Sequence, residues 1–228
     1  MLMQTPVQRA TAKPFPNALP ATAARQDCLA DTISLMGATM SFPRNAEIFG
    51  DDEPADYVYK VISGGVRTYK ILTDGRRQIG AFYMPGDIFG LEAGDEHRCS
   101  AEAICNSSIL VIKRSAVVAL AQRDGSVARQ LWAFTARELE SAQVHMLLLI
   151  KSAQERVVSF LLEMAERLAS AETVELPMSR QDIADYLGLT IETVSRTLTQ
   201  LEAEATIELP TSRRVVLRNR KTLQRLNA

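Results

Sequence analysis

Residues 179–203 read SRQDIADYLGLTIETVSRTLTQLEA, and this stretch decides the C-terminal fold. Ser179 and Asp182 have the spacing of a helix capping box, in a weaker form than one that uses Glu or Gln. We expect a first helix over 180–187. Gly188 should end it, because glycine readily adopts the positive φ found at helix C-termini.

A second helix is expected after the glycine turn, with Thr190 as its N-cap. Its apolar residues recur at steps of four and three, which indicates one buried stripe. The residues expected to face inward are Ile183, Ala184 and Leu187 in the first helix and Val194, Leu198 and Leu201 in the second. Ala184 is small and lets the two helices cross closely. Two short helices around a tight turn form a helix-turn-helix.

The outer face of the second helix has the chemistry of DNA base reading. Glu192 and Arg196 are one turn apart, and Ser195 flanks them. Near a helix start such side chains can reach base edges in the major groove. Arginine can donate two hydrogen bonds to guanine, glutamate can accept one from cytosine, and serine can bond several bases. Alternatively Glu192 and Arg196 form an i, i+4 salt bridge, which is compatible with base reading.

Two short runs after this helix, 206–209 and 214–217, predict a β-wing with its tip at 210–213. From 211 to 228 the chain has basic residues and no acid, so the region is either a solvated tail or a phosphate-binding surface. Phosphate contacts supply affinity and register rather than sequence choice. The residues predicted to contact the DNA backbone or to support the site are Ser179, Arg180, Thr190, Thr193, Arg213 and Arg214.

Residues 126–151 contain no Pro or Gly, and their apolar residues recur at helical spacing on two faces. A helix with two apolar faces must bury both. One face can pack on its own domain, and the economical partner for the other is the same helix of a second chain. The alternative is a helix buried inside a monomer. The residues predicted for the dimer contact are Trp132, Leu139, Met146 and Leu149.

The N-terminal half is β-rich. Strand-like runs at 57–62, 66–71, 78–83 and 109–112 are separated by turn signals such as Ser63-Gly64-Gly65 and Asp74-Gly75, which favours an antiparallel roll. The expected class is α+β. We divide the chain into a loose segment (1–26), a β-roll (27–125, with a short helix at 27–35), a dimerisation helix (126–151) and a winged helix-turn-helix (152–228). The last part begins with an amphipathic helix over 154–170.

The bulk composition narrows the function classes. The 228 residues carry a formal net charge of −1, so nucleic-acid binding must depend on local charge. Three cysteines, Cys28, Cys99 and Cys105, form no Cys-x-x-Cys pair, and we interpret them as packing residues with a redox role as the alternative. We expect a cytoplasmic chain, because the N-terminus has no signal-peptide pattern and the longest apolar run, 146–150, is too short to span a bilayer.

Together these features resemble the CRP/FNR superfamily of bacterial transcription regulators, in its FNR and FixK-type branch. The resemblance covers about residues 28–228 and rests on Gly64-Gly65, on PGDIFG at 85–90, on the long helix and above all on LGLTIETVSR at 187–196. It implies a cyclic-nucleotide-binding-like β-roll, a homodimer, RNA polymerase as partner, and a palindrome of the TTGA-N6-TCAA type. In the cyclic-AMP branch an arginine stands at the position of Ile191.

The departures from the family concern sensing. The cyclic-AMP pocket uses a Glu after its Gly, an Arg-Ser pair on the roll and a Thr-Ser pair on the long helix. This chain has Gly90-Leu91, Arg98-Cys99 and Ser141-Ala142. We therefore expect no cyclic nucleotide. An N-terminal cysteine cluster for an iron–sulfur centre is missing, and His97 and His145 are expected to be packing residues rather than haem ligands.

Three hypotheses follow. The first is a dimeric DNA-binding activator of micro-oxic, respiratory or nitrogen-fixation genes that needs no cofactor. The second is a cyclic-nucleotide receptor whose helical tail contacts proteins. The third is an enzyme, which we do not expect because the sequence shows no nucleophile–base pair, metal-ligand cluster or phosphate loop.

Overall fold

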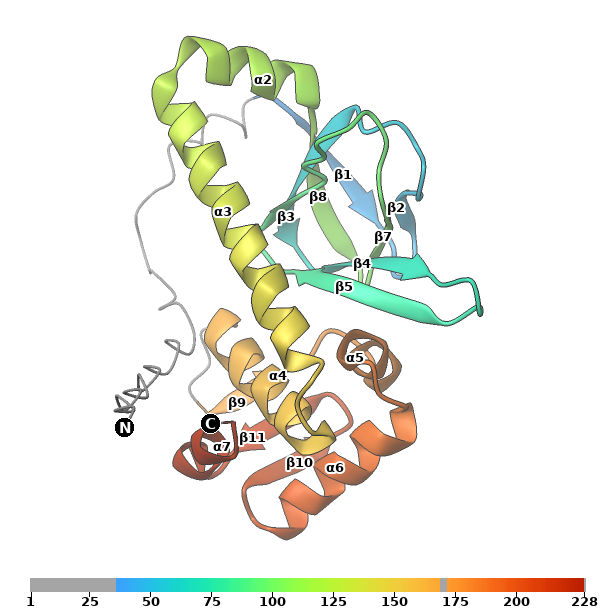
Figure 1. The fold of residues 1–228 in the computed structure, drawn as a ribbon, viewed down its shortest axis with the longest axis vertical. Helices are drawn as coiled ribbons and strands as arrows, with labels where there is room; N and C mark the ends of the chain where they lie inside the picture. The colour runs from blue at the N-terminus through green and yellow to red at the C-terminus, as the bar shows by residue number, and fades with distance from the viewer. Residues whose placement is uncertain (1–35, 169–171, 228) are drawn as a thin grey trace, which may run out of the picture.

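A computed structural model describes residues 36–168 and 172–227. An N-terminal β-roll and a C-terminal helical domain with a small sheet are joined by one long helix (Figure 1). The expected α+β class is confirmed. The segment 1–26, the short helix expected at 27–35 and Cys28 lie outside the described residues.

The roll is made of two antiparallel four-stranded sheets, in the orders β1-β8-β3-β6 and β2-β7-β4-β5. The strands are β1 (Ala38–Phe42), β2 (Glu47–Phe49), β3 (Tyr57–Ser63), β4 (Val66–Ile71), β5 (Arg77–Tyr83), β6 (Ile88–Phe89), β7 (Ser100–Ala103) and β8 (Ser107–Lys113). The four predicted strands are β3, β4, β5 and β8. The sequence patterns do not predict the other four, which are only two to five residues long.

The roll has a packed interior and a tight glycine turn between β3 and β4. The rings of Phe49 and Tyr59 lie 5.2 Å apart inside the roll. Gly64 has a φ of 86°, and a Cβ added there would lie 2.3 Å from the Oγ atom of Ser107. This turn therefore needs glycine for both its conformation and its space.

Two helices follow the roll: α2 (Arg114–Arg123) and α3 (Gly125–Leu148). No pattern in the sequence predicts α2. Val127 of α3 is buried with residues of α2 and β8, so one apolar face of α3 packs within the chain as expected. The helix ends at Leu148 rather than at the predicted residue 151, because Ser152 is already in the extended conformation of the N-cap of α4.

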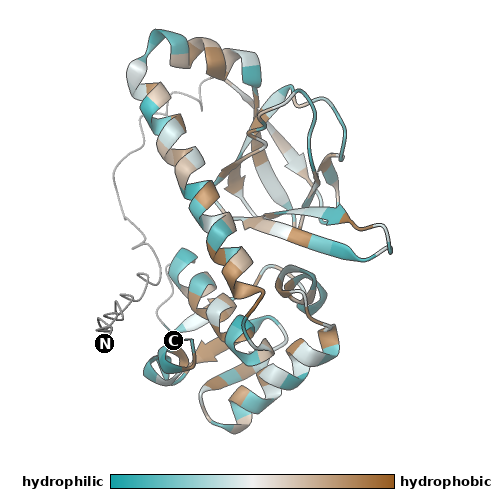
Figure 2. Cartoon of the chain, viewed as in Figure 1, coloured by the Kyte–Doolittle hydropathy of each residue, from teal (hydrophilic) through white to brown (hydrophobic). Residues whose placement is uncertain are grey.

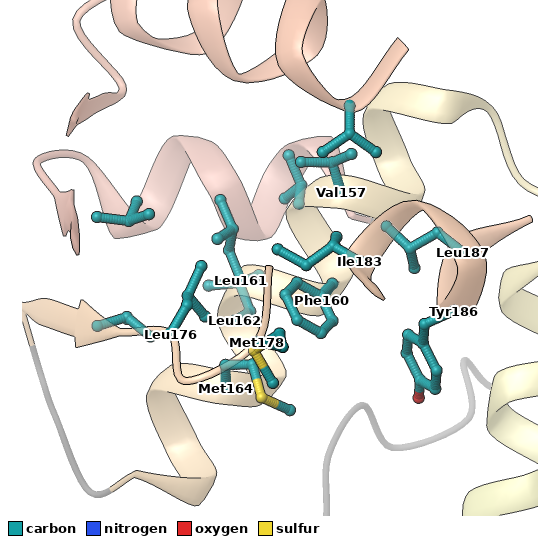
Figure 3. Packing of buried hydrophobic residues seen from close by; sticks show 14 of the residues in the cluster. Val157, Phe160, Leu161, Leu162, Met164, Leu176, Met178, Ile183, Tyr186 and Leu187 are labelled. Atoms are coloured by element: carbon teal, nitrogen blue, oxygen red, sulfur yellow. The ribbon is translucent and has the colours of Figure 1, made fainter. Parts of the chain in front are cut away.

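The C-terminal domain contains α4 (Ala153–Arg167), α5 (Arg180–Leu187), α6 (Ile191–Ala203) and α7 (Arg220–Leu226). Its sheet has the order β10-β11-β9, with β9 (Thr173–Glu175), β10 (Ile207–Thr211) and β11 (Arg214–Leu217). Figure 3 shows the core, in which Phe160 of α4 lies beside Ile183 of α5. Of the five apolar residues that the helical spacing predicts to face inward here, Leu168 is partly buried and the other four are buried: Val157, Phe160, Leu161 and Met164.

The wing differs from the expectation in one respect. Pro210 and Thr211 belong to β10, so the tip is reduced to Ser212 and Arg213. Proline is tolerated there because β10 is an edge strand, and one side of an edge strand forms no hydrogen bonds with another strand. Within the described residues no helix is long and apolar enough to cross a bilayer.

Candidate nucleic-acid interface

The predicted helix-turn-helix is present in α5 and α6. Gly188 has a φ of 62° and ends α5 in the left-handed conformation. The Oγ atom of Ser179 accepts a hydrogen bond from the Asp182 N–H at 3.1 Å, and the Asp182 carboxylate accepts one from the Ser179 N–H at 3.0 Å. The capping box is therefore complete despite its aspartate. Ala184 is fully buried, as a close crossing requires.

An arginine of α4 donates hydrogen bonds to the glycine turn between α5 and α6, and no sequence pattern predicts this contact. The Nη1 atom of Arg156 donates hydrogen bonds to the carbonyl oxygens of Leu187 at 2.9 Å and Gly188 at 3.4 Å. Carbonyl groups at a helix C-terminus have no partner inside the helix, so this side chain supplies one. Arg156 lies 31 residues before Leu187, and no local signal marks the contact.

The helix α6 has one face in the core and one in solvent. Its expected inward residues are all buried: Val194, Leu198 and Leu201. Glu192 and Arg196 are exposed, and Ser195 is half-buried beside them. The ion pairs of the described residues do not include one between Glu192 and Arg196, so neither side chain is held by the other.

Two of the predicted supporting residues stabilise the first turn of α6, and a third contacts Ser195. The Oγ1 atom of Thr190 accepts a hydrogen bond from the Thr193 N–H at 3.2 Å, which makes Thr190 the expected N-cap. The Nη1 atom of Arg180 donates to the Oγ atom of Ser195 at 3.4 Å. Its Nε atom is buried and has no partner within the described chain.

The wing carries three arginines in different electrostatic settings. Arg218 forms an ion pair with Glu208, and the Nε atom of Arg214 lies 3.9 Å from Glu175. Arg213, at the tip, has no acidic partner among the described residues. Its guanidinium can therefore meet a phosphate without first leaving a carboxylate.

Comparison with known proteins places this geometry in a family. Residues 155–226 match the Crp-like helix-turn-helix domain, and residues 39–124 match the cyclic nucleotide-binding domain. The chain is 53% identical over 205 residues to the nitrogen fixation regulation protein FixK of Azorhizobium caulinodans, covering 87% of this chain and 83% of that protein. The chain belongs to the FixK-type branch of the CRP/FNR superfamily.

Two further relatives agree with this placement. The transcriptional activatory protein AadR of Rhodopseudomonas palustris is 46% identical over 170 residues, which are 72% of this chain and 71% of that protein. The structure of FixK2 from Bradyrhizobium japonicum has a TM-score of 0.82 and 55% identity, covering 85% of this chain and 98% of that one. The FixK-type chain is thus a transcription regulator with a helix-turn-helix DNA-binding domain, and not an enzyme.

In this FixK-type chain most of the predicted dimer residues are on the surface of α3. Trp132 is 78% exposed, Leu139 60% and Met146 62%. Figure 2 shows apolar residues recurring along the helix. Leu149 lies just beyond α3 and is half-buried, with its Cδ2 atom 3.6 Å from where a Cβ on Gly188 would stand. Leu149 therefore packs toward the turn of its own helix-turn-helix.

In the FixK-type chain, the residues at the positions of the family's cyclic-AMP pocket differ in exposure. Leu91 and Arg98 are exposed, and Cys99 is half-buried. Burial, with the negative charges of Glu92 and Asp51, raises the pKa of the Cys99 thiol to about 11. A thiol with so high a pKa stays protonated and poorly reactive.

The two histidines and the cysteines of the FixK-type chain form no metal site within the described residues. His97 is buried, and its ring stacks on Phe49 at 3.6 Å. His145 is half-buried, with its ring 4.1 Å from that of Tyr186. Both therefore pack against aromatic rings.

Proposed function

We propose that this FixK-type regulator is an activator that binds palindromic duplex DNA as a homodimer, with one α6 helix in the major groove of each half-site. The observation that carries the proposal is the solvent-facing set of Glu192, Ser195 and Arg196 on a helix whose other face is buried. Arginine reads guanine and glutamate accepts from cytosine, which suits half-sites of the TTGA-N6-TCAA type. Half-sites should lie about one helical turn, roughly 34 Å, apart.

The exposed stripe of α3 supports the homodimer. Trp132, Leu139 and Met146 follow one another at intervals of seven residues, the repeat of a coiled-coil seam. An exposed apolar patch of this kind is typical of an interaction site. A second copy of α3 would cover the patch, and the resulting twofold axis would match a palindrome.

We further infer that the roll works without a bound cyclic nucleotide, haem or iron–sulfur cluster. The residues at the family's nucleotide position do not fit the ligand: Leu91 cannot accept a hydrogen bond from a ribose hydroxyl. Burial and the negative charges of Glu92 and Asp51 raise the pKa of the Cys99 thiol. The same charges would repel an anionic phosphate placed beside Cys99. The chain has three cysteines, Cys28, Cys99 and Cys105, which are fewer than the four thiolates that commonly hold an iron–sulfur cluster.

The target genes are proposed from the relatives. The FixK relative is named as a regulator of nitrogen fixation, and AadR is named as a transcriptional activatory protein. We propose that this chain controls micro-oxic, respiratory or nitrogen-fixation genes and that its DNA-bound dimer recruits RNA polymerase.

Selection of bound duplexes from a random pool, with the purified chain and no added ligand, tests the proposal. We expect a palindrome with TTGA-like half-sites to be enriched. A Ser195→Gly variant should shift the enriched sequence, whereas Arg218→Gln, which changes a wing residue paired with Glu208, should leave it unchanged. No enrichment, or an asymmetric site bound by a single subunit, would contradict the proposal. Calorimetry with cyclic AMP and cyclic GMP should show no binding.

A further inference from the structure

A cluster of charged side chains joins the roll to the first helix of the helix-turn-helix. The Nη1 atom of Arg67, on β4, lies 3.0 Å from the Oδ1 atom of Asp182, on α5. The Nη2 atom of Arg77, on β5, lies 2.7 Å from the same oxygen and 2.8 Å from Asp185. The side chains of Arg67 and Asp182 are only 8% and 4% exposed, so their contact is shielded from water.

Both ends of the cluster are held by further contacts. On the roll, Arg67 also pairs with Glu102, which accepts a hydrogen bond from the Tyr69 hydroxyl at 2.7 Å. Burial acts to raise the pKa of Asp182, but hydrogen bonds from Ser179 and the charges of the two arginines hold it below its usual value. Asp182 is therefore ionised at neutral pH, and each arginine has an anionic partner on α5.

Neutral contacts continue the same interface along α5. The Nε2 atom of Gln78, on β5, donates a hydrogen bond to the carbonyl oxygen of Tyr186 at 3.2 Å. The ring of Tyr186 lies 5.2 Å from that of Phe82, also on β5. In Figure 1 α5 lies next to β5, between the roll and α6. The charged cluster thus holds the start of α5, and the neutral contacts hold its end.

Asp182 also stabilises the first turn of α5 through its hydrogen bonds with Ser179. Its Oδ2 atom accepts hydrogen bonds from the Ser179 N–H at 3.0 Å and the Ser179 hydroxyl at 2.7 Å, while Oδ1 faces the arginines. Asp182 therefore both completes the capping box of α5 and contacts the arginines of the roll. Because α5 is joined to α6 by the closed Gly188 turn, an orientation imposed on α5 is passed to α6.

A buried ion cluster is a poor way to gain stability, since apolar side chains of similar volume often serve as well. Its advantage is directional: the planar guanidinium fork fixes the angle and register of its partner. We propose that Arg67 and Arg77 are positioning residues for DNA recognition, which orient α5 and α6 on the roll so that the two recognition helices of a dimer match the half-site spacing. This inference rests on the proposed function.

Arg77→Gln in the full-length chain tests the inference, because Arg77 is 23% exposed and its loss is less disruptive to the fold than loss of Arg67. The matched control is Arg76→Gln, which removes an adjacent arginine that is 77% exposed and whose ion-pair partner among the described residues is Asp74. Affinity is measured for the selected palindrome and for palindromes with a spacer one base pair shorter or longer. We expect Arg77→Gln to lose roughly 5- to 150-fold in affinity for the native spacing, the range of ordinary intersite coupling.

The series of spacer lengths distinguishes a change in the orientation of α5 and α6 from a general loss of protein stability. In Arg77→Gln the altered spacers should lose less affinity, relative to the native spacer, than they do in the wild type and in Arg76→Gln. Asp185→Asn, which removes one of the two carboxylates that Arg77 contacts on α5 and leaves the Ser179–Asp182 cap in place, should change the spacer preference in the same direction. Arg77→Lys should restore only part of the spacer preference, because lysine keeps the charge without the fork.

Two results would overturn the inference: unchanged affinity in both Arg77→Gln and Asp185→Asn, or lowered affinity with the spacer preference of the wild type. Hydrogen exchange gives an independent reading, since α5 amides should exchange faster in both variants and not in Arg76→Gln. Failure of the wild type and Arg76→Gln to bind any palindrome would instead contradict the proposed function.

Discussion

The Nη1 atom of Arg180, at the start of α5, lies 3.4 Å from the Oγ atom of Ser195 on the outer face of α6. Arg180 is predicted to contact the DNA backbone, and through this hydrogen bond it also contacts Ser195, which is predicted to read a base. Arg180 is half-buried, so its positive charge lies beside the outer face of α6, where we predict a contact with the DNA backbone.

Arg180→Gln should therefore affect both affinity and base choice. We expect a weaker dependence of log affinity on log salt, by about 1 unit, and reduced discrimination at the base contacted by Ser195. Titrations at several salt concentrations against single-base-pair substitutions measure both effects. Arg213→Gln, at the wing tip, is the control and should weaken binding to all sequences alike. Equal losses on every sequence for Arg180→Gln would refute its link to Ser195.

Arg196→Ala should cost about 1–3 kcal/mol of binding free energy at one base pair, because the guanidinium fork donates two hydrogen bonds to a guanine. The measurement is the affinity of the variant for the palindrome and for each of its single substitutions. Gln200→Ala, one turn further along α6, should leave binding unchanged, since Gln200 bonds Glu204 within the helix. If Arg196→Ala lost the same affinity on all duplexes, Arg196 would be a phosphate contact instead.

Ile191 is the first residue of α6 and is 36% exposed, so an apolar side chain lies at the end of the helix that we propose enters the groove. Such a side chain can contact the methyl group of thymine. We expect Ile191→Arg to favour guanine over thymine at one position of each half-site. Selection from a random pool would show this directly, and an unchanged consensus would exclude Ile191 from base contact.

Leu139→Glu should prevent formation of the proposed dimer, because it places a charge in the middle of the exposed stripe of α3. Leu139 is 60% exposed in the single chain, so the substitution should leave the fold of the subunit intact. Sedimentation velocity should show a monomer, and binding to the palindrome should be lost with it. Arg123→Glu, an exposed change at the end of α2, should remain dimeric. A dimeric Leu139→Glu variant would place the subunit contact elsewhere.

The parts of the fold that could be predicted are those with local signals. Ser179, Gly188 and Thr190 mark the ends of α5 and α6 because caps and glycine turns act within a few residues. The strand β6 could not be predicted, because its two residues carry no period. The contact between Arg67 and Asp182 spans 115 residues, and Arg156 bonds the turn from another helix. Such contacts depend on how helices and strands that are far apart in the sequence pack together. The local spacing of residues does not predict this packing.

His145, on the last turn of α3, packs its ring 4.1 Å from that of Tyr186 on α5. Burial lowers the pKa of His145 below its usual value of 6.5, so the folded chain holds it neutral at pH 7. At pH values between the lowered pKa of the folded chain and 6.5, the unfolded chain binds a proton at this site that the folded chain does not. The free energy of unfolding must therefore fall as the pH decreases through this range, by at most about 1.4 kcal/mol per pH unit.

His145→Phe should remove this dependence and keep an aromatic ring against Tyr186. Urea unfolding of both proteins at pH 7.5 and pH 5.5, at one fixed protein concentration, measures the difference. The other titrating groups are common to the two chains and cancel in the comparison. We expect the variant to gain stability relative to the wild type at pH 5.5, because only the wild type must expel a proton to fold. Equal pH dependence in the two proteins would mean that His145 is protonated without cost in the folded state.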